Sequence, residues 1–346
     1  MSLIKYIARR LLLMVPIVLG VLTLTFVLSR FLPGDPVLAS LPKYPAPELV
    51  EAKRREMGLY DPMIVQYFRY LWDVFSGNWG RSLTVAPYVE VTDYLRQVVP
   101  RTFQLAIFPV ILSSIIGVKV GVYSARYRNK PQDTIIRGIA VAGVAVPVFW
   151  MGLLFQYFLG YRLGNFTGGV FQFPVVGFKN ARLSDPPLIT GFRLIDCFLA
   201  DEPVLLFDTI MHLILPVTCL TIISIASITR QTRSSMLEVM EQDYIRTARA
   251  KGCAENEVIN KHALRNALIP TATVIGFSLA GLLTGAVLTE TTFNIEGLGM
   301  GLVSAIQTDD YWVINGIVLV VAIIFVLSNL AVDIAYAIID PRIKYT

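Results

Sequence analysis

The sequence predicts an all-α integral membrane protein with six transmembrane helices. Of its 346 residues, 55% are hydrophobic and only 16% are charged, and the mean hydropathy is +0.61. A soluble domain with so few charges would present too little polar surface to water. The apolar stretches are long runs of Leu, Ile and Val without the alternation of membrane β-barrel strands, which favours helices.

Six apolar runs approach the length of about 20 residues that a helix needs to cross a bilayer core of ~30 Å. The predicted spans are residues 11–28, 103–123, 138–159, 213–228, 272–288 and 313–337. With the N-terminus inside, the inner segments carry a net positive charge and the outer segments a net negative charge. The positive-inside rule therefore predicts that both termini lie in the cytoplasm. A basic balance that follows topology in this way argues against nucleic-acid binding.

The first apolar run follows the basic segment MSLIKYIARR, a combination that is also found in signal peptides. The run is long enough to span, and the following SRFLPGDPV offers no small-residue cleavage pattern, so we expect a retained anchor. The outer segment after it, residues 31–100, is too long for a simple connection. We expect it to fold as a cap with helices at 47–57 and 62–75, and with turns at FLPGDP and GNWGRSL.

Small and ionisable residues inside the spans suggest contacts between helices. Gly117 and Gly121 lie one turn apart in the second span, and Gly281 and Gly285 do so in the fifth, which allows close helix packing. The alternative is that Gly281 and Gly285, together with Glu290 near the outer face, line a pathway or vestibule. Lys119 and Asp333 lie at matching depths, and an ion pair between them is left open.

A polar stretch, residues 233–270, interrupts the two long apolar segments on either side of it. Leu237, Met240, Tyr244 and Ala248 recur at spacings of three and four, which predicts one face of a helix. Gly252 is expected to end that helix. A shorter helix should follow at residues 254–261, with Pro270 opening the next helix. The simplest interpretation is a solvated loop, but its length and pattern indicate a folded element.

This stretch resembles the EAA loop, the cytoplasmic loop of permeases in ATP-binding-cassette importers. Ala248 and Gly252 match the family pattern, whereas Arg246 and Thr247 replace its Glu and first Ala, and Arg265 stands at the place of its Pro. The segments YIRTARAKG and HALRNALIP are similar to the variant in the dipeptide, oligopeptide and nickel branch. Pro-Gly-Asp-Pro after the first span also resembles that branch, as does the ending NLAVDIAYAIIDPRIKY.

A further match follows the fifth span, where the family pattern is Glu-x-x-Phe-x-x-Pro-Gly-Leu-Gly. Its members here are Glu290, Phe293, Gly297, Leu298 and Gly299, with Glu296 in place of the proline. The resemblance implies a type I importer fold in an inner prokaryotic membrane. Its parts would be a first helix plus cap (1–97), a core (98–337) with a coupling loop (231–270), and a cytoplasmic tail (338–346).

The resemblance also implies a function and partners. The chain would be the permease subunit of an ATP-driven importer of di- or oligopeptides; nickel or oligosaccharides remain alternative substrates. Its partners would be a second, related permease, two ATPase subunits that hold ATP and Mg²⁺, an outer solute-binding protein facing residues 165–207, and lipid. The residues expected to couple to the ATPase are Tyr244, Thr247, Ala248, Gly252, Cys253, Glu255, Val258 and Ile259.

Signatures of enzymes are absent from the sequence. There is no GxxxxGK[ST], HExxH or GxSxG motif, so we expect no catalytic residues, no bound cofactor and no metal site in this chain. The three cysteines are scattered and predict no disulfide framework. A secondary transporter that works without ATP is a less favoured alternative, because few charges fall near mid-membrane. A membrane enzyme would need a reactive constellation that is not visible.

Overall fold

The computed structural model describes residues 3–31, 36–39, 41 and 44–339 of the chain. Within these ranges the backbone forms helices and loops, and the β-pairing is one isolated antiparallel bridge between Arg81 and Glu90. The helices in chain order are α1 (Leu3–Phe31), α2 (Pro36–Ala39), α3 (Pro47–Glu56), α4 (Met63–Phe75), α5 (Val91–Arg126), α6 (Pro131–Ala145), α7 (Val148–Phe155), η1 (Gln156–Arg162), α8 (Leu163–Phe166), α9 (Arg193–Leu199), α10 (Pro203–Met240), α11 (Asp243–Ala250), α12 (Glu255–Glu257), η2 (Val258–Ala263), α13 (Leu264–Gly285), α14 (Val287–Phe293), α15 (Leu298–Gln307) and α16 (Tyr311–Ile339).

Five straight segments of the described chain are long and apolar enough to cross a membrane. These segments are Arg9–Leu28, Val91–Arg126, Pro203–Met240, Glu255–Leu283 and Tyr311–Ala331. They correspond to the first, second, fourth, fifth and sixth predicted spans. The predicted boundaries were too narrow for α5 and α10, because both helices continue well beyond the apolar run into packed regions at the membrane surfaces.

The third predicted span, residues 138–159, is not one straight helix. α6 and the following segment Val148–Phe166 meet at an angle of 97°, so six crossings result only if this bent pair counts as one. Val146 has an extended backbone with φ −83° and ψ 122°, and Pro147 follows it. A proline disfavours helical geometry in the preceding residue and cannot donate its own backbone hydrogen bond, which explains the bend here.

The two helices predicted within the cap lie close to their predicted positions, as α3 and α4. The predicted turn FLPGDP lies largely outside the described residues. α4 packs on α1, where the hydroxyls of Thr23 and Tyr67 are 2.7 Å apart and the rings of Phe26 and Tyr67 meet edge to face at 5.3 Å. At the start of α16, the Asp310 carboxylate accepts hydrogen bonds from the Ser82 hydroxyl at 2.6 Å and from the backbone N–H of Leu83 at 2.9 Å. The chain between α4 and α5 is thereby tied to the start of α16.

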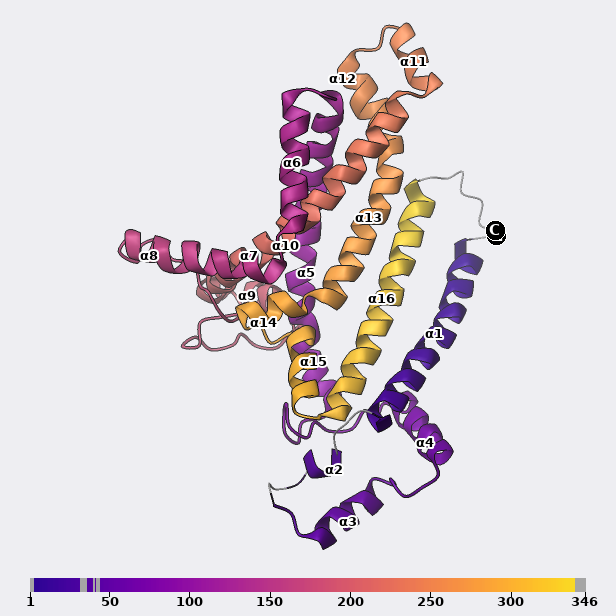
Figure 1. Ribbon diagram of the computed structural model, residues 1–346, viewed down its shortest axis with the longest axis vertical. Coiled ribbons are helices and arrows are strands. Elements are labelled where there is room, and N and C mark those ends of the chain that lie inside the picture. The colour runs from indigo at the N-terminus through magenta and orange to yellow at the C-terminus, as the bar shows by residue number, and fades with distance from the viewer. Residues whose placement is uncertain (1–2, 32–35, 40, 42–43, 340–346) are drawn as a thin grey trace.

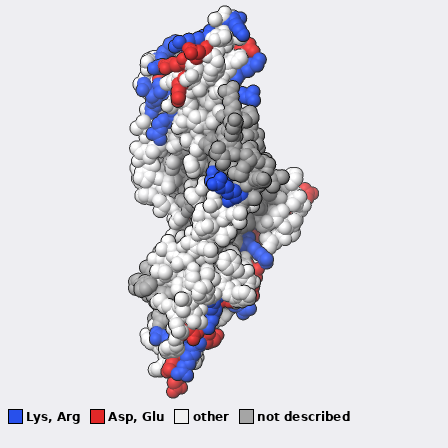
Figure 2. Space-filling model, turned by 90° about the vertical axis from the view of Figure 1, so that its right-hand side faces the viewer, with Lys and Arg blue, Asp and Glu red and all other residues white. Residues whose placement is uncertain are grey.

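The two ends of the molecule are polar, and the zone between them is not. Figure 1 places α11 and α12 at one end and the cap helices α2, α3 and α4 at the other. Figure 2 shows Lys, Arg, Asp and Glu gathered mainly at these two ends, with a broad and mostly uncharged band between them. This distribution is what a lipid-embedded belt requires, because charged side chains are costly in hydrocarbon.

A close helix contact joins α5 to α10 through the two predicted glycines of the second span. A Cβ atom on Gly117 would lie 2.9 Å from the Cβ of Ile228, and one on Gly121 would lie 2.6 Å from the Cβ of Thr232. Both distances are shorter than side chains tolerate, so only glycine permits this approach. The predicted packing role of Gly117 and Gly121 is therefore confirmed.

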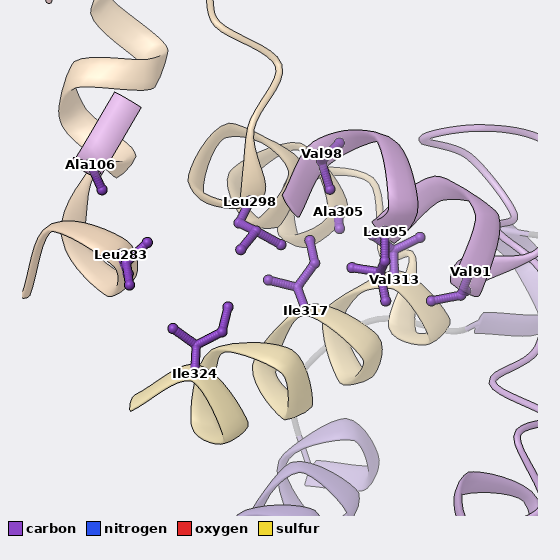
Figure 3. Close-up of a cluster of buried hydrophobic side chains, with 10 residues drawn as sticks. All are labelled: Val91, Leu95, Val98, Ala106, Leu283, Leu298, Ala305, Val313, Ile317 and Ile324. Carbon is purple, nitrogen blue, oxygen red and sulfur yellow. The ribbon is translucent and has the colours of Figure 1, made fainter. Parts of the chain in front are cut away.

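A hydrophobic core lies between α5, α13, α15 and α16 (Figure 3). Val91, Leu95 and Val98 of α5 face Val313 and Ile317 of α16, with Leu298 and Ala305 of α15 beside them in the close-up. Spacings of three and four along each helix bring these side chains onto one face. The core fixes the outer ends of the spans relative to one another.

Candidate coupling site

The polar stretch between the fourth and fifth spans begins as a continuation of α10 and then breaks. α10 ends at Met240, and Gln242 takes an extended conformation with φ −72° and ψ 150° before α11 begins at Asp243. The prediction of one helical face from Leu237 to Ala248 is therefore wrong. The periodicity continues across the break because both helices pack on the same core, although the backbone between them turns.

α11 presents one buried face and one exposed face. Ile245 is fully buried and Ala248 is 9% exposed, whereas Tyr244 is 43% exposed. Tyr244, which was predicted to share a helical face with Ala248, instead lies on the surface, where its hydroxyl accepts a hydrogen bond of 2.7 Å from the Asn266 side chain. Thr247 is also exposed. The exposed face of α11 is therefore free of contacts with the core and open to a partner.

Gly252 ends α11 as predicted, with a left-handed backbone at φ +79°. Its N–H donates to the carbonyl of Arg249 at 3.0 Å, and the N–H of Cys253 donates to the carbonyl of Ala248 at 3.3 Å. This pair of bonds is a Schellman motif, which satisfies carbonyls at a helix end. A Cβ atom on Gly252 would meet no atom within 4 Å, so the backbone angle alone requires glycine.

A surface ion pair joins α11 to α12 across this turn. The guanidinium of Arg249 donates to both carboxylate oxygens of Glu255, at 3.1 and 2.9 Å. The hydrogen bonds to Glu255 raise the pKa of Arg249, so the charge on the guanidinium is held firmly. The two side chains are 38% and 49% exposed, and exposed ion pairs contribute little to the free energy of unfolding. The main effect of this pair is to hold α11 and α12 in their relative positions at the turn.

The short helix predicted at residues 254–261 does not exist as a separate element. α12, η2 and α13 follow one another without a break, so the helix that begins at Glu255 continues into the fifth span. Pro270 lies inside α13 rather than at its first turn. Such prolines are tolerated in membrane helices when packing and local adjustment of the helix accommodate the missing bond.

Val258 and Ile259, predicted to contact an ATPase, point inward instead and are at most 2% exposed. They belong to a hydrophobic cluster that we call the inner core. It consists of the buried residues Ala125, Met236, Ile245, Ala248, Val258, Ile259, Ala263 and Ala267. These residues come from α5, α10, α11, η2 and α13, and half-buried Cys253 packs against them. The polar stretch is thus joined to three spans by apolar packing.

A buried ion pair that the sequence analysis missed lies beside the inner core. Asp133, in the first turn of α6, is fully buried and receives two hydrogen bonds from the guanidinium of Arg233 on α10, at 2.7 and 2.8 Å. The Ser124 hydroxyl of α5 and the backbone N–H of Asn129 donate to the same carboxylate at 2.6 and 3.0 Å. We call these groups the Asp133 clamp. An acidic residue just after Pro131 was the only signal available in the sequence.

Glu290 lines a cavity of about 80 Å³ together with Thr102 and residues of α13, α15 and α16. It is fully buried, and its carboxylate accepts hydrogen bonds from the Thr102 hydroxyl at 2.7 Å and from the backbone N–H of Met300 at 3.0 Å. Burial raises its pKa, which the hydrogen bond from Thr102 partly opposes. Gly297 lies against this carboxylate, where a Cβ atom would clash. The Glu-x-x-Phe pattern therefore holds the α14–α15 connection together.

The other residues predicted on a pathway remain without an assigned role. Gly281 is exposed on α13, and a Cβ there would meet no described atom within 4 Å. Gly285 is the last residue of α13, and its surroundings lie outside the described part of the structure. The predicted ion pair between Lys119 and Asp333 also lies outside it, because the Asp333 side chain is not described. Lys119 itself is exposed.

The three cysteines are free, with Cys197 and Cys219 buried and Cys253 half-buried. A search for three or more His, Cys, Asp or Glu side chains placed to hold a metal ion finds none among the described residues. A bundle of long apolar helices with polar segments at both ends is the architecture of a multi-pass membrane protein.

Comparison with known proteins gives the family. The chain belongs to the binding-protein-dependent transport system inner membrane components, whose family model matches residues 117–345. The model for the N-terminal part of such components matches residues 3–113. The protein is therefore a multi-pass protein of the bacterial inner membrane and a permease component of a binding-protein-dependent transporter.

Several relatives match over nearly the whole chain. The dipeptide transport system permease protein DppB of Alkalihalophilus pseudofirmus is 42% identical, with 98% of this chain and 99% of the relative covered. The dipeptide permease of Escherichia coli K12 is 40% identical, with 99% of each chain covered. The oligopeptide transport system permease protein AppB of Bacillus subtilis is 38% identical, with 98% of this chain and 99% of the relative covered.

Proposed function

We propose that this chain is the membrane-spanning permease subunit of an ATP-driven importer that carries di- or oligopeptides into the cytoplasm. The observation that carries the proposal is the folded inner loop, whose exposed face on α11 is joined through the inner core to three spans. The names of the relatives support peptides over nickel or oligosaccharides as the substrate class. ATP and Mg²⁺ would be held by separate ATPase subunits, since the sequence has no P-loop of its own.

The mechanism follows from how the inner loop is attached. An ATPase that binds one arrangement of the helices better than another shifts the permease toward that arrangement. An ATPase bound to the exposed face of α11, which carries Tyr244 and Thr247, would displace this helix. Ile245 and Ala248 on the opposite face pack in the inner core, so the inner core would move with it. Because packed cores are hardly compressible, α5, α10 and α13 would move as a unit at their inner ends.

The proposed mechanism also implies how the chain is oriented in the membrane and where its other partners would bind. Both termini would lie in the cytoplasm with the inner loop, as the distribution of basic residues favours. A solute-binding protein would then dock on the cap and on residues 165–207, a segment that ion pairs of Asp185 with Lys179 and Arg193 help to order. Those two partners lower the pKa of Asp185 although burial opposes the shift. A second, related permease would complete the pathway.

Substitution of Gly252 tests the coupling role. A β-branched residue at φ +79° costs about 1–2 kcal/mol in the left-handed conformation, so Gly252→Val should distort the link between α11 and α12. We expect peptide uptake by proteoliposomes containing all subunits to fall several-fold, while ATP hydrolysis continues without stimulation by the loaded binding protein. Gly252→Asn is the matched control, because asparagine tolerates this conformation.

Wild-type uptake and stimulation in the Gly252→Val variant would contradict the coupling role. A separate measurement addresses the alternative of an ATP-independent carrier. When the chain is purified in mild detergent after expression with its partners, an ATPase subunit should remain bound. Peptide uptake by the chain alone in liposomes without ATP would instead support the secondary transporter.

A further inference from the structure

One side of α4, the cap helix that lies beside α1, consists of large apolar side chains open on the surface of the chain. They are Ile64, Phe68, Trp72 and Phe75, each between 62% and 75% exposed. Their spacings of four and three place all of them within an arc of roughly 80° on the helix. Single exposed apolar residues are ordinary, whereas a contiguous apolar patch marks an interaction surface. We call these four residues the α4 apolar face.

The other side of α4 packs on α1 and fixes how the helix is rotated. The hydroxyls of Tyr67 and Thr23 are 2.7 Å apart, and those of Tyr70 and Thr25 are 3.2 Å apart. The ring of Phe26 on α1 lies 5.3 Å from the ring of Tyr67 and 5.7 Å from that of Tyr70. Residues two apart lie about 200° apart on a helix, so Tyr70 is nearly opposite the middle of the α4 apolar face. That face is therefore turned away from α1.

The same contacts set the depth of α4 relative to the membrane. They fall within the apolar span Arg9–Leu28 of α1. From the rise per residue of a helix, Thr23 and Phe26 lie roughly 7.5 and 3 Å before the last residue of that span. Interfacial helices bury their apolar faces about 5–10 Å into the boundary between headgroups and acyl chains. α4 therefore lies at the depth of a lipid interface, beside the end of α1 nearest the cap (Figure 1).

The surface of α1 at this depth is also apolar and open. Only 17% of the apolar window of this span is buried within the chain. Leu24 and Leu28 of α1 are 58% and 44% exposed. In a membrane span such side chains contact lipid, because lipid is the apolar phase that surrounds the helix. The α4 apolar face continues this lipid-facing surface at the level where the span ends.

The length and composition of α4 fit a helix that lies on a bilayer rather than one that crosses it. It has 13 residues, whereas a crossing needs about 20. Its polar groups lie outside the α4 apolar face, where Gln66 is buried and Arg69 pairs with Asp61 at 2.7 Å. Tryptophan, present here as Trp72, is enriched at the level of lipid headgroups. An apolar face on one side of a helix and polar groups on the other are the pattern of an interfacial helix.

We propose that α4 lies in the membrane interface on the side of the cap, with the α4 apolar face inserted among the lipids. The partner is the surface of a phospholipid bilayer. Because the α4 apolar face carries no charge, a zwitterionic lipid such as phosphatidylcholine suffices. The contact holds the base of the cap at a fixed height beside α1. The proposal requires that α1 spans the membrane and goes beyond the proposed function, since it depends neither on the solute nor on an ATPase.

Spin labels on single cysteines test the position of α4. The full-length chain is reconstituted in phosphatidylcholine nanodiscs, alone and with its co-expressed partners. Cys253→Ala provides the background, because Cys197 and Cys219 are buried. Each residue of the α4 apolar face is replaced by a labelled cysteine in turn. Molecular oxygen concentrates in lipid and a nickel chelate stays in water, so the ratio of their collision rates with the label reports what surrounds it.

Two exposed positions calibrate this ratio. Leu12→Cys, at a site 71% exposed on α1, is the lipid standard, and Glu51→Cys, at a site 57% exposed on α3, is the water standard. All four positions of the α4 apolar face should exceed the water standard several-fold and approach the lipid standard, with and without partners. Arg69→Cys is the matched control on the same helix, and its ratio should be lower because this side chain lies outside the α4 apolar face.

A fluorescent label at Trp72→Cys gives an independent measure of depth. Lipids that carry a nitroxide near the headgroup should quench it more strongly than lipids that carry one near the end of the acyl chain. Stronger quenching from the chain end would overturn the proposal, and so would collision ratios at the α4 apolar face equal to the water standard. Slow collisions with both reagents when the partners are present would also overturn it, because another protein would then cover this face.

Discussion

Two buried carboxylates in different parts of the molecule are held in different ways. Asp133, at the inner end, is bonded by the guanidinium of Arg233 and joins α6 to α10. Glu290, on α14, has no cation among its bonded partners and is held by Thr102 of α5 and by backbone N–H groups in the first turn of α15. The first is an ion pair between spans, and the second is a set of uncharged donors from two helices.

The difference indicates how each end of the permease is built. At the inner end, where the proposed coupling force arrives, a charge pair and the close contact at Gly121 bind α5, α6 and α10 into one rigid unit. At the outer end, the protonated form of Glu290 is favoured by burial, so the contact there responds to pH. In the proposed mechanism, the inner unit would transmit movement.

The largest effect should come from breaking the Asp133 clamp. Asp133→Ala leaves the Arg233 guanidinium without its partner in a site that is 18% exposed, and we expect a loss of about 3 kcal/mol in unfolding free energy. Urea or thermal unfolding in detergent micelles measures it. The double variant Asp133→Leu with Arg233→Leu should recover much of this loss, because no unpaired charge remains. If Asp133→Ala has the same unfolding free energy as the wild type, the Asp133 clamp does not stabilise the fold.

A smaller effect should come from the glycines. Gly121→Ala places a methyl group 2.6 Å from the Thr232 Cβ and 2.8 Å from the Thr229 carbonyl oxygen, so α5 and α10 must separate, at a cost of about 1–3 kcal/mol. Gly281→Ala is the matched control on α13, where alanine should stabilise the helix by about 0.5–1 kcal/mol. Lost uptake in a stable Gly281→Ala variant would place Gly281 on the pathway or against the second permease. Equal stability of both variants would contradict the close inner contact.

The smallest effect concerns Glu290 and depends on pH. Because its pKa is raised by burial, its contribution to stability is fully present below the ordinary glutamate pKa and is lost as pH rises through the raised value. Wild-type stability should therefore decline across that window. Glu290→Gln should flatten the decline and change unfolding free energy by only about 1 kcal/mol at low pH. Thermal unfolding between pH 4 and 8 checks this, and parallel curves for both proteins would argue against titration of Glu290.

Prolines show where sequence rules hold and where they fail. Pro147 follows an extended residue and marks the 97° bend of the third span, yet the sequence analysis predicted one continuous span over residues 138–159. Pro270 was expected to begin a helix and instead lies inside α13. The residue is the same in both places, but the packing of η2 and α13 on the inner core maintains the helix around Pro270. Local propensity could not distinguish the two cases.

The sequence by itself determined the features that depend on composition and on single backbone positions. Apolar length and the distribution of charge predicted the spans, spacing predicted the cap helices, and Gly252 predicted the left-handed turn. Tertiary structure decided which side chains meet. Asp133 and Arg233 are 100 residues apart in sequence and meet only in the folded protein. Glu290 is buried. Packing in the inner core determines which face of α11 is buried and which is exposed. Such contacts depend on how helices pack in three dimensions, which the periodicity of each helix does not contain.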